Sequence, residues 1–438
     1  MIVNVIGGGL AGCEASYQLL KRGFSVNLYE MKPQKFSPAH HMSTLAELVC
    51  SNSLKSNDIT TAEGLLKEEL RRMDSLLINV ADSTAVPAGS ALAVDRTLFS
   101  ELVTTKLKSF DNFKLIEGEV IDIDLSQPTI IATGPLTSDL LSQKISQLVG
   151  EESLYFFDAI APIVTYESIN FDSAFVQDRY NKGSGDYINC PLTKEEYDTF
   201  YNELINAECV ELKDFENKKV FEGCMPIEVL AKRGYDTMRF GPLKPVGLTD
   251  KEGKTPYAVI QLRRETNNYD FYNMVGFQTN LKFGEQKRVF SLIPALQNAE
   301  FLRYGTMHKN TYINAPKSLT KYFQLKDYDK VFVAGQLSGV EGYVESIMGG
   351  LICGINMSRV LNNQSLIELP ILTMTGALQN YIATASPVNF QPMSANMGLI
   401  NNLEKKIKDK KEKNKYLSDR ALDLLEKYIQ EGNINDGI

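Results

Sequence analysis

The first thirty residues constrain the fold of this chain more than any other stretch. Residues 1–6 form a short, apolar, β-branched run that predicts a buried strand. Gly7, Gly9 and Gly12 follow in G-x-G-x-x-G spacing, and apolar side chains then recur at helical intervals as far as Arg22. Residues 24–29 predict a second strand, which ends at Glu30. A strand–helix–strand unit of this kind is typical of an α/β domain of Rossmann type that binds a dinucleotide.

Each glycine of this turn has its own expected role. Gly7 permits the tight turn, Gly9 lets the backbone approach a pyrophosphate, and Gly12 lets the helix pack closely on the strand. Gly8 belongs to the same turn. Glu30 lies 18 residues beyond Gly12, where an acid binds a ribose hydroxyl and disfavours the 2′-phosphate of NADP. The unit therefore predicts a site for the ADP moiety of FAD or NAD, with an ordinary βαβ unit that binds nothing as the alternative.

Composition sets the outer limits. A chain of 438 residues predicts two or three domains. Its net charge of −8 argues against an overall basic nucleic-acid binder, although a local patch can override the total. The six cysteines form no C-x-x-C pair, so we expect a cytoplasmic enzyme with reduced thiols, no disulfide framework and no metal site. The first strand begins at the N-terminus and no apolar run is long enough to span a membrane, so we expect neither a signal peptide nor a membrane segment.

Two later stretches predict further parts of the same cofactor site. Residues 129–135 (TIIATGP) read as a strand and a turn, which favours FAD over NAD. Residues 331–334 predict another strand, followed by a glycine-rich turn over 335–342 and a helix over 343–358. This arrangement is typical of FAD proteins of the glutathione-reductase type, although glutamine stands where an acid is usual. The candidate cofactor residues of these stretches are Thr133, Gly134, Gly335, Gln336, Gly342 and Tyr343.

The regular α/β alternation fades in the middle of the chain, which predicts an inserted α+β domain. We expect a first part of the FAD-binding domain over 1–139, the inserted substrate- or RNA-binding domain over 140–305, and a second part with a basic C-terminal helix over 306–438. Other expected elements are one helix over 61–79, paired strands over 114–123, strands at 160–166, 257–262 and 273–279, and a helix near 194–207.

Two cysteines lie in settings that suggest chemistry. Residues 221–247 place Cys224 in a tight turn, and several cations with interleaved aromatics follow it, which suits a phosphate backbone and a splayed-out base. The alternative is a solvated surface with ordinary ion pairs. Cys50 stands in the polar sequence ELVCSNSL, which leaves both a chemical role and a buried structural thiol open. The lysines of 405–415 form either a solvated helix face or a contact to RNA phosphates.

Taken together, these stretches resemble the folate- and FAD-dependent uracil-5-methyltransferases of RNA, the TrmFO family. The resemblance runs nearly end to end and includes VIGGGLAGCEA, ELVCSNSL, VPAGSALAVDR, TIIATGPL, FEGCMPIEVLAKRG, FGPLKPVGL, YGTMHKNTYINAP, FVAGQLSGVEGYVES and NFQPM. It implies that NAD(P)H reduces bound FAD and that methylenetetrahydrofolate supplies the carbon that methylates C5 of a uridine, usually in the T-loop of tRNA. Close relatives act on 23S rRNA, so the RNA target stays open, and no stable protein partner is inferred.

The resemblance also implies roles for individual residues. Cys224 matches the nucleophile that adds to C6 of uracil, and Cys50 matches the second thiol, a general base for the C5 proton. Lys232 and Arg233 are candidates for binding substrate and for activating Cys224. The family usually has histidine stacking on the pterin where this chain has Asn280 in GFQTNL.

His308 is expected near the flavin. The other readings left open are a flavin oxidoreductase acting on a small molecule or a disulfide, and a non-catalytic RNA-binding flavoprotein.

Overall fold

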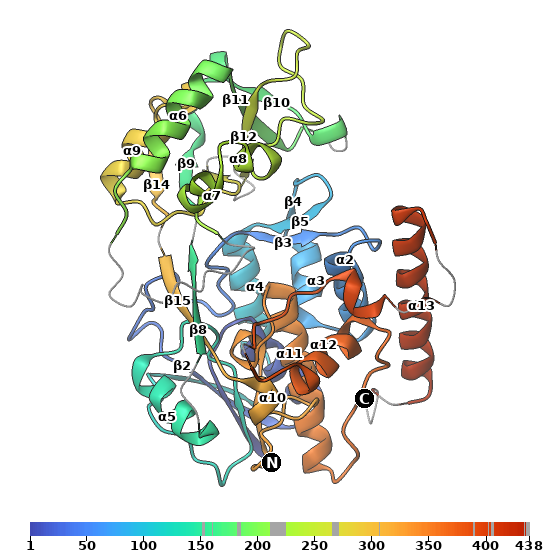
Figure 1. Cartoon of the computed structure of the whole chain (residues 1–438). Helices are drawn as coiled ribbons and strands as arrows, with labels where there is room; N and C mark the ends of the chain where they lie inside the picture. Colours follow the sequence, from blue (N-terminus) through green and yellow to red (C-terminus); the bar gives the residue numbers. More distant parts are fainter. Residues whose placement is uncertain are drawn as a thin grey trace.

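The computed structural model describes most of the chain. The described residues are 1–150, 154–159, 161–181, 185–210, 225–264, 271–305, 307–388, 390–401, 403, 407–432 and 434. Cys224 lies outside them. In these residues the chain forms a large lower part and a smaller upper part, with α13 standing against the lower part (Figure 1).

A five-stranded parallel sheet forms the centre of the lower part. Its order is β16–β7–β1–β2–β6, with β1 and β2 in the register Ile6↔Tyr29. Strand β16, which precedes α11 late in the chain, is separated from β1 only by β7. This parallel sheet has the α/β fold of Rossmann type that the sequence predicts. The strands are β1 (Ile2–Ile6), β2 (Ser25–Glu30), β6 (Phe113–Glu117), β7 (Thr129–Ile131) and β16 (Val331–Val333).

Two central helices pack tightly beside this sheet. They are α1 (Leu10–Leu20) and α11 (Tyr343–Leu361). A Cβ atom at Gly350 would lie 2.2 Å from the carbonyl oxygen of Ala11, and one at Gly354 would lie 2.8 Å from that of Ala15. The two glycines therefore let the helices approach backbone to backbone, so that both N-termini point to the same edge of the sheet.

The remaining helices of the lower part surround this centre (Figure 1). They are α2 (Ala62–Arg72), α3 (Leu76–Ser83), α4 (Arg96–Lys108), α5 (Asp139–Val149), α10 (Ala315–Ser318), α12 (Met374–Thr384) and α13 (Lys410–Gln430). A small antiparallel sheet, of order β3–β5–β4, lies at the upper end. Its strands are β3 (Ser53–Ser56), β4 (Ala85–Val86) and β5 (Ala91–Val94).

The upper part is formed by the middle of the chain, where the sequence predicts an inserted domain. It is built on a six-stranded sheet of order β10–β11–β12–β13–β9–β14, in which every neighbouring pair is antiparallel. A two-stranded ribbon, β8 (Leu154–Ala159) with β15 (Met307–Tyr312), rises between the two parts (Figure 1). The other elements are β9 (Ile163–Thr165), β10 (Phe175–Val176), β11 (Tyr187–Leu192), β12 (Ala258–Arg264), β13 (Phe271–Met274), β14 (Phe301–Arg303), α6 (Lys194–Asn206), α7 (Ile227–Arg233), α8 (Thr237–Phe240) and α9 (Phe283–Phe290).

Each part has its own apolar core. The first core contains residues from both ends of the chain, and the second contains residues between Val164 and Phe301. Leu141 and Ile145 of α5 belong to the first core, so the chain passes to the second core only after this helix.

Three expected elements differ from the structure. The single helix over 61–79 is wrong, because Asp74 adopts φ 57° and Ser75 starts a new helix as its N-cap. The paired strands over 114–123 are also wrong, since only β6 forms and Gly118 turns away with φ 143°. The strand expected over 273–279 ends at Met274. The expected helices near 194–207 and 343–358 are confirmed.

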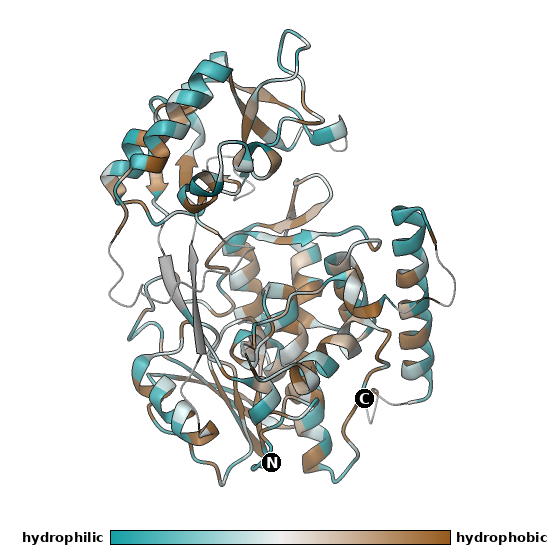
Figure 2. Cartoon of the chain, viewed as in Figure 1, coloured by the Kyte–Doolittle hydropathy of each residue, from teal (hydrophilic) through white to brown (hydrophobic). Residues whose placement is uncertain are grey.

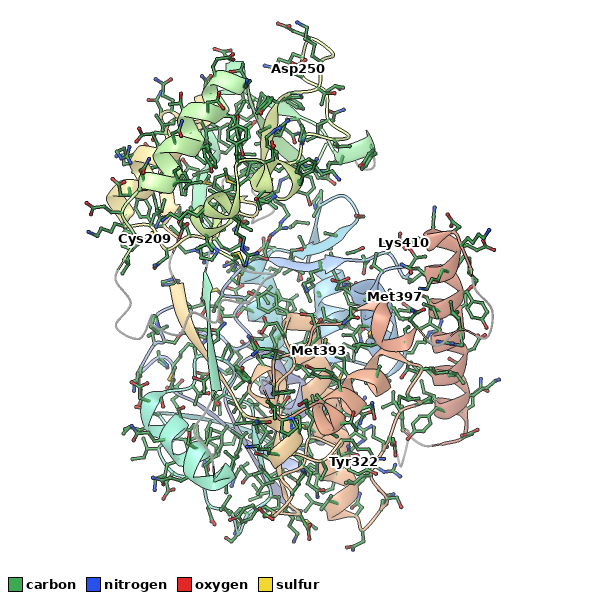
Figure 3. All side chains as sticks on the ribbon, in the orientation of Figure 1. Cys209, Asp250, Tyr322, Met393, Met397 and Lys410 are labelled. Atoms are coloured by element: carbon green, nitrogen blue, oxygen red, sulfur yellow. The ribbon has the colours of Figure 1, made fainter. Side chains whose placement is uncertain are left out.

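The C-terminal helix α13 begins at Lys410. Its first turns are hydrophilic in Figure 2, and Lys410 marks this end in Figure 3. No helix in the described part of the chain is both long enough and apolar enough to span a membrane.

Candidate active site

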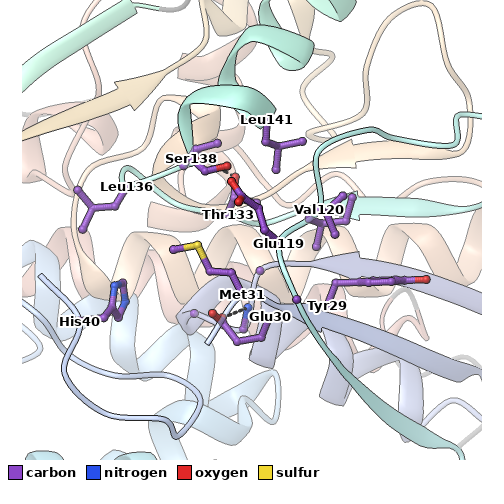
Figure 4. A pocket seen from close by; sticks show the side chains of 16 residues that line it. Tyr29, Glu30, Met31, His40, Glu119, Val120, Thr133, Leu136, Ser138 and Leu141 are labelled. Atoms are coloured by element: carbon purple, nitrogen blue, oxygen red, sulfur yellow. Dashed lines mark hydrogen bonds between the residues drawn. The ribbon is translucent and has the colours of Figure 1, made fainter. Parts of the chain in front are cut away.

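A pocket opens at the carboxyl edge of the parallel sheet (Figure 4). The pocket is partly open, and its empty volume, including the part open to solvent, is about 550 Å³. Three loops that follow β1, β2 and β6 line it, together with the turn after β7. The lining residues are Ile6, Gly7, Gly8, Gly9, Tyr29, Glu30, Met31, His40, Gly118, Glu119, Val120, Thr133, Leu136, Thr137, Ser138 and Leu141.

The glycine turn fits a pyrophosphate. A Cβ atom at Gly9 would meet nothing within 4 Å, whereas one at Gly12 would lie 1.8 Å from the carbonyl oxygen of Gly7. Gly9 is the N-cap of α1 and no side chain caps that helix end. The first amides of α1 therefore face open space beside Gly9, which is the cradle that an anionic dinucleotide requires.

Glu30 closes the adjacent side of the pocket. Its carboxylate accepts hydrogen bonds from the amides of Gly8 at 2.8 Å and Lys32 at 3.0 Å. Figure 4 shows Glu30 beneath Met31, on the wall opposite Thr133 and Glu119. The carboxylate is thus held at the end of β2, where an acid binds ribose hydroxyls.

The long connection after Glu30 folds back over the glycine turn. The amide of Ala46 donates to the carbonyl oxygen of Gly8 at 2.8 Å. A buried ion pair between Lys32 and Glu47, at 3.5 Å, secures the loop. His40 of this loop lines the pocket, and burial lowers the pKa of its imidazole. The loop therefore forms one wall of the cofactor pocket.

The second cofactor segment lies against the same helix. A Cβ at Gly335, which has φ 72°, would lie 2.8 Å from the Cβ of Ala11 in α1. Gln336 donates through Nε2 to the carboxylate of Glu341, so an acid does stand beside this turn although it comes five residues later. Gly342 has φ 124° and precedes the first residue of α11.

Tyr343, at the start of α11, holds the segment that carries Cys50. Its hydroxyl oxygen accepts hydrogen bonds from the amides of Cys50 at 2.6 Å and Ser51 at 3.2 Å. Burial and the neighbouring Cys50 thiol raise the pKa of the Tyr343 phenol well above its ordinary value. The phenol therefore stays protonated while it fixes the backbone of Cys50, 293 residues away in sequence.

Two residues of the inserted domain hold the same segment from the other side. The Arg303 guanidinium donates to the carbonyl oxygens of Val49 at 3.3 Å and Cys50 at 3.4 Å. Asn52, which is fully buried, donates to the carbonyl of Arg264 at 2.9 Å. Cys50 is therefore a partly exposed thiol at the junction of the two domains, beside a fixed positive charge.

The structure gives positions for three of the expected substrate residues. Lys232 and Arg233 are exposed at the end of α7. Asn280 is 7% exposed, and its Nδ2 donates to the carbonyl of Val210 at 3.0 Å. Val210 follows Cys209, which lies at the edge of the inserted domain that faces the lower part (Figure 3). Of His308, only the backbone position in β15 is described.

Asn280 nevertheless has a clear position. It connects to α7, because Glu228 accepts hydrogen bonds from the Asn280 amide at 2.9 Å and from Thr279 at 2.8 Å. Burial raises the pKa of Glu228. Residues 278–280 thus anchor both chain ends, at Val210 and at Ile227, that flank the stretch containing Cys224.

Several pocket residues were missed by sequence reasoning. Gly118, Glu119 and Val120 follow β6, which pairs with β2 so that Glu117 lies opposite Glu30. The Glu-Gly pair at the end of an apolar run indicates that the strand ends there, whereas the pattern of residues 114–123 predicts two strands. No group of metal-ligating side chains occurs among residues whose placement is described.

The chain is similar to proteins of one known family. A sequence profile of the family described as "Glucose inhibited division protein A" matches residues 2–365. The chain is 55% identical over 428 residues to the methylenetetrahydrofolate–tRNA-(uracil-5-)-methyltransferase TrmFO of Acetivibrio thermocellus, and the match covers 98% of each chain. It is 56% identical over 431 residues to the TrmFO of Natranaerobius thermophilus, covering 98% of this chain and 99% of the relative.

A solved structure supports the fold. GidA of Aquifex aeolicus, in its form II crystal, aligns with a TM-score of 0.66 at 15% sequence identity. The alignment covers 98% of this chain and 76% of the GidA chain. At this identity the likeness concerns the arrangement of elements alone.

Proposed function

Because this chain belongs to the TrmFO methyltransferases within the glucose inhibited division protein A family, we propose that it methylates C5 of a uridine in tRNA with carbon from methylenetetrahydrofolate. The chain is a methyltransferase that uses FAD, and NAD(P)H is its reductant. A flavin oxidoreductase acting on a small molecule is not favoured by these relatives. The target RNA, tRNA in preference to 23S rRNA, is part of the proposal.

The observation that carries the proposal is the position of Cys50. A thiol stands at the domain junction, tied to the first residue of the cofactor-facing helix α11 through Tyr343. Arg303 provides a positive charge at the same backbone segment. A partly exposed thiol whose backbone is held in this way is positioned for proton transfer or nucleophilic work.

The chemistry requires two such groups. C5 of uracil is a poor nucleophile until a thiolate adds to C6 and the C5=C6 electron pair becomes enolate-like. A base must then remove the C5 proton. We assign the addition to Cys224 and the proton removal to Cys50. Lys232 and Arg233, in the helix that follows Cys224, are proposed to bind RNA phosphate.

The residues around the glycine turn fit FAD. Gly7, Gly8 and Gly9 would hold its pyrophosphate, Glu30 its ribose, and the turns at Thr133, Gly134 and Gly335 its remaining length. When bound there, FAD supplies the redox chemistry and the transfer of the one-carbon unit. Tyr343, the first residue of α11, binds the backbone of Cys50, and we propose that it couples cofactor binding to the position of the thiol.

The decisive experiment uses labelled methylenetetrahydrofolate, NADPH and the purified holoprotein with two RNAs in parallel. Label in C5 of a uridine of unmodified tRNA is the expected result. Label only in 23S rRNA would retain the chemistry and overturn the target. No label in either RNA, with reducible FAD bound, would reject the proposed methyl transfer.

The cysteine roles need their own comparison. Cys224→Ala is expected to abolish methylation and leave FAD bound, and Cys50→Ala is expected to stop release of tritium from [5-³H]uridine in RNA. Cys209→Ala is the matched control, since Cys209 is also partly exposed but lies outside the proposed site. Loss of flavin in Cys224→Ala would contradict the assignment of that residue.

A further inference from the structure

One row of side chains crosses five of the six strands of the inserted sheet. Five residues are consecutive cross-strand partners, from β11 through β12, β13 and β9 to β14. They are Tyr187, Arg263, Asn273, Ile163 and Arg303. Residues directly opposite each other in antiparallel strands share a face, so Tyr187, Arg263, Asn273 and Ile163 point to the same side of the sheet. Arg303 pairs with Ile163 where the register of β14 shifts.

That side meets the lower domain at the Cys50 segment. Arg263 donates through Nε to the side-chain oxygen of Asn52 at 3.3 Å, and Arg303 donates to the carbonyl of Cys50 at 3.4 Å. The opposite face of the sheet, with Ile260, Leu262 and Met274, belongs to the apolar core. Asn273 lies between Arg263 and Ile163 in this row, on the face from which Arg263 donates to Asn52.

Asn273 is unusual among the buried amides of this sheet. Its side chain is 2% exposed, yet its Nδ2 has no hydrogen-bond partner among the described residues. Asn189, two strands away, is fully buried and satisfied: its Nδ2 donates to the carbonyl of Gln177 at 2.8 Å and its oxygen accepts from Gln261 at 3.0 Å. Leaving a buried polar group without a hydrogen bond destabilises the folded protein. Such a group in a native structure calls for a ligand or another specific role.

We propose that Asn273 is a substrate-binding residue whose Nδ2 donates a hydrogen bond to O4 of the target uracil. This inference rests on the proposed function. When the thiolate forms its Sγ–C6 bond, the C5=C6 electron pair moves toward C4 and negative charge develops on O4. A preorganised N–H donor aimed at that oxygen stabilises the charge, and the guanidinium of the neighbouring Arg263, which is 8% exposed, adds to it in a site largely screened from water.

The test exploits the missing partner. Asn273→Ala removes no hydrogen bond of the free protein, so the midpoint of thermal unfolding should change little. Asn189→Ala, the matched control, breaks several bonds and should lower that midpoint clearly. Methylation by Asn273→Ala should fall about 10²- to 10³-fold in kcat, the usual loss for one donor to a developing oxyanion. RNA affinity should change less than about threefold, because phosphate contacts dominate it.

A second variant removes the donor without changing the shape. Asn273→Asp should lose tritium release from [5-³H]uridine in RNA to the same extent as Asn273→Ala, with FAD content and NADPH-dependent flavin reduction unchanged. If both variants release tritium as fast as the wild-type protein does, this inference is overturned and the proposed function stands. A raised KM for methylenetetrahydrofolate with normal tritium release would assign the amide to the pterin instead. Absence of tritium release in the wild-type protein would reject the proposed function itself.

Discussion

Gly7, Gly9 and Gly12 are each glycine for a different structural reason. Gly7 has φ 106°, and a Cβ there would lie 2.5 Å from the carbonyl oxygen of Ala132. Gly12 packs against Gly7 itself, whereas Gly9 borders open space. Gly7 and Gly12 are therefore needed for the fold, and Gly9 is needed only for what binds beside it.

Gly9→Val should therefore fold and lose FAD. Gly9 has φ −79°, which any residue adopts, so the new side chain strains nothing and occupies the space of the pyrophosphate. The visible absorbance of bound flavin is the measurement, and we expect a loss of about tenfold or more. Gly284→Val, at a second glycine with open space around it, should leave flavin content unchanged. Full FAD content in Gly9→Val would contradict the assignment of the pyrophosphate to this turn.

Tyr343→Phe tests the link between cofactor and thiol. The change removes the oxygen that accepts from the amides of Cys50 and Ser51. Losing an acceptor of this kind costs about 1–3 kcal/mol, so we expect kcat for methylation to fall roughly 10- to 100-fold while FAD stays bound. The control is Tyr381→Phe, which loses a single bond to the carbonyl of Gln391. Equal activity of the two variants would contradict the positioning role.

At the scale of elements, buried carboxylates organise the helix ends. Glu14 accepts hydrogen bonds from the amide of Leu77 at 3.0 Å and from Ser75 at 2.8 Å, at the start of α3. Glu69 does the same for α12, accepting from the amides of Met374 at 2.7 Å and Thr375 at 2.8 Å. Both satisfy amides that a helix N-terminus leaves without partners. They join α1 to α3 and α2 to α12, so the packing of these helices depends on them.

The Glu69 contact should make stability depend on pH. Burial raises the pKa of Glu69 from 4.5 to about 7. The folded protein therefore holds this proton more tightly than the unfolded chain, so the contribution is present below about pH 4.5 and is lost as the pH rises through about 7. Glu69→Gln has no such titration. Between pH 4.5 and pH 8 we expect the wild-type protein to lose up to about 3 kcal/mol of unfolding free energy relative to Glu69→Gln.

Chemical denaturation of the two holoproteins across that range gives the measurement. Glu68→Gln, on the exposed side of α2, is the control for removing a charge from the same helix. A pH-independent difference for Glu69→Gln would mean that the three hydrogen bonds it accepts outweigh its burial.

At the scale of the whole molecule, a few polar contacts unite the two domains around Cys50. Asn52 donates to the carbonyl oxygens of Val94, in the lower domain, and of Arg264, in the inserted domain. Asp186 of the inserted domain accepts from the amide of Gly89 at 2.6 Å. The domain junction is thus defined by directional hydrogen bonds, which set orientation more strictly than apolar contact does.

Asn52→Ala should weaken this junction selectively. The variant loses both donated bonds and the one accepted from Arg263, so we expect methylation to fall at least tenfold with FAD still bound. Asn189→Ala again serves as a control, since its bonds stay inside the inserted domain. Limited proteolysis at the domain junction should be faster in Asn52→Ala than in Asn189→Ala. Equal proteolysis and full activity would show that the junction is held without Asn52.

The sequence by itself determined the parallel sheet and the first cofactor segment. The glycine turn, the flanking strands and Glu30 are local in sequence, and short-range backbone geometry decides their conformation. The residue types of the second segment were also readable, although Glu341 as the nearby acid was not. The local sequence around Cys50 and Cys224 suggested chemistry but left their roles open, and the family resemblance supplied those roles.

Only the tertiary structure decided what surrounds Cys50. Its partners Tyr343 and Arg303 lie more than 250 residues away in sequence, and the row through Asn273 exists only once five strands are in register. For Asn280 the sequence motif predicts a contact with a ligand, whereas in the structure its hydrogen bonds are to Val210 and Glu228. Contacts of this range depend on the packing of both domains, and no periodicity or motif of a single segment contains that information.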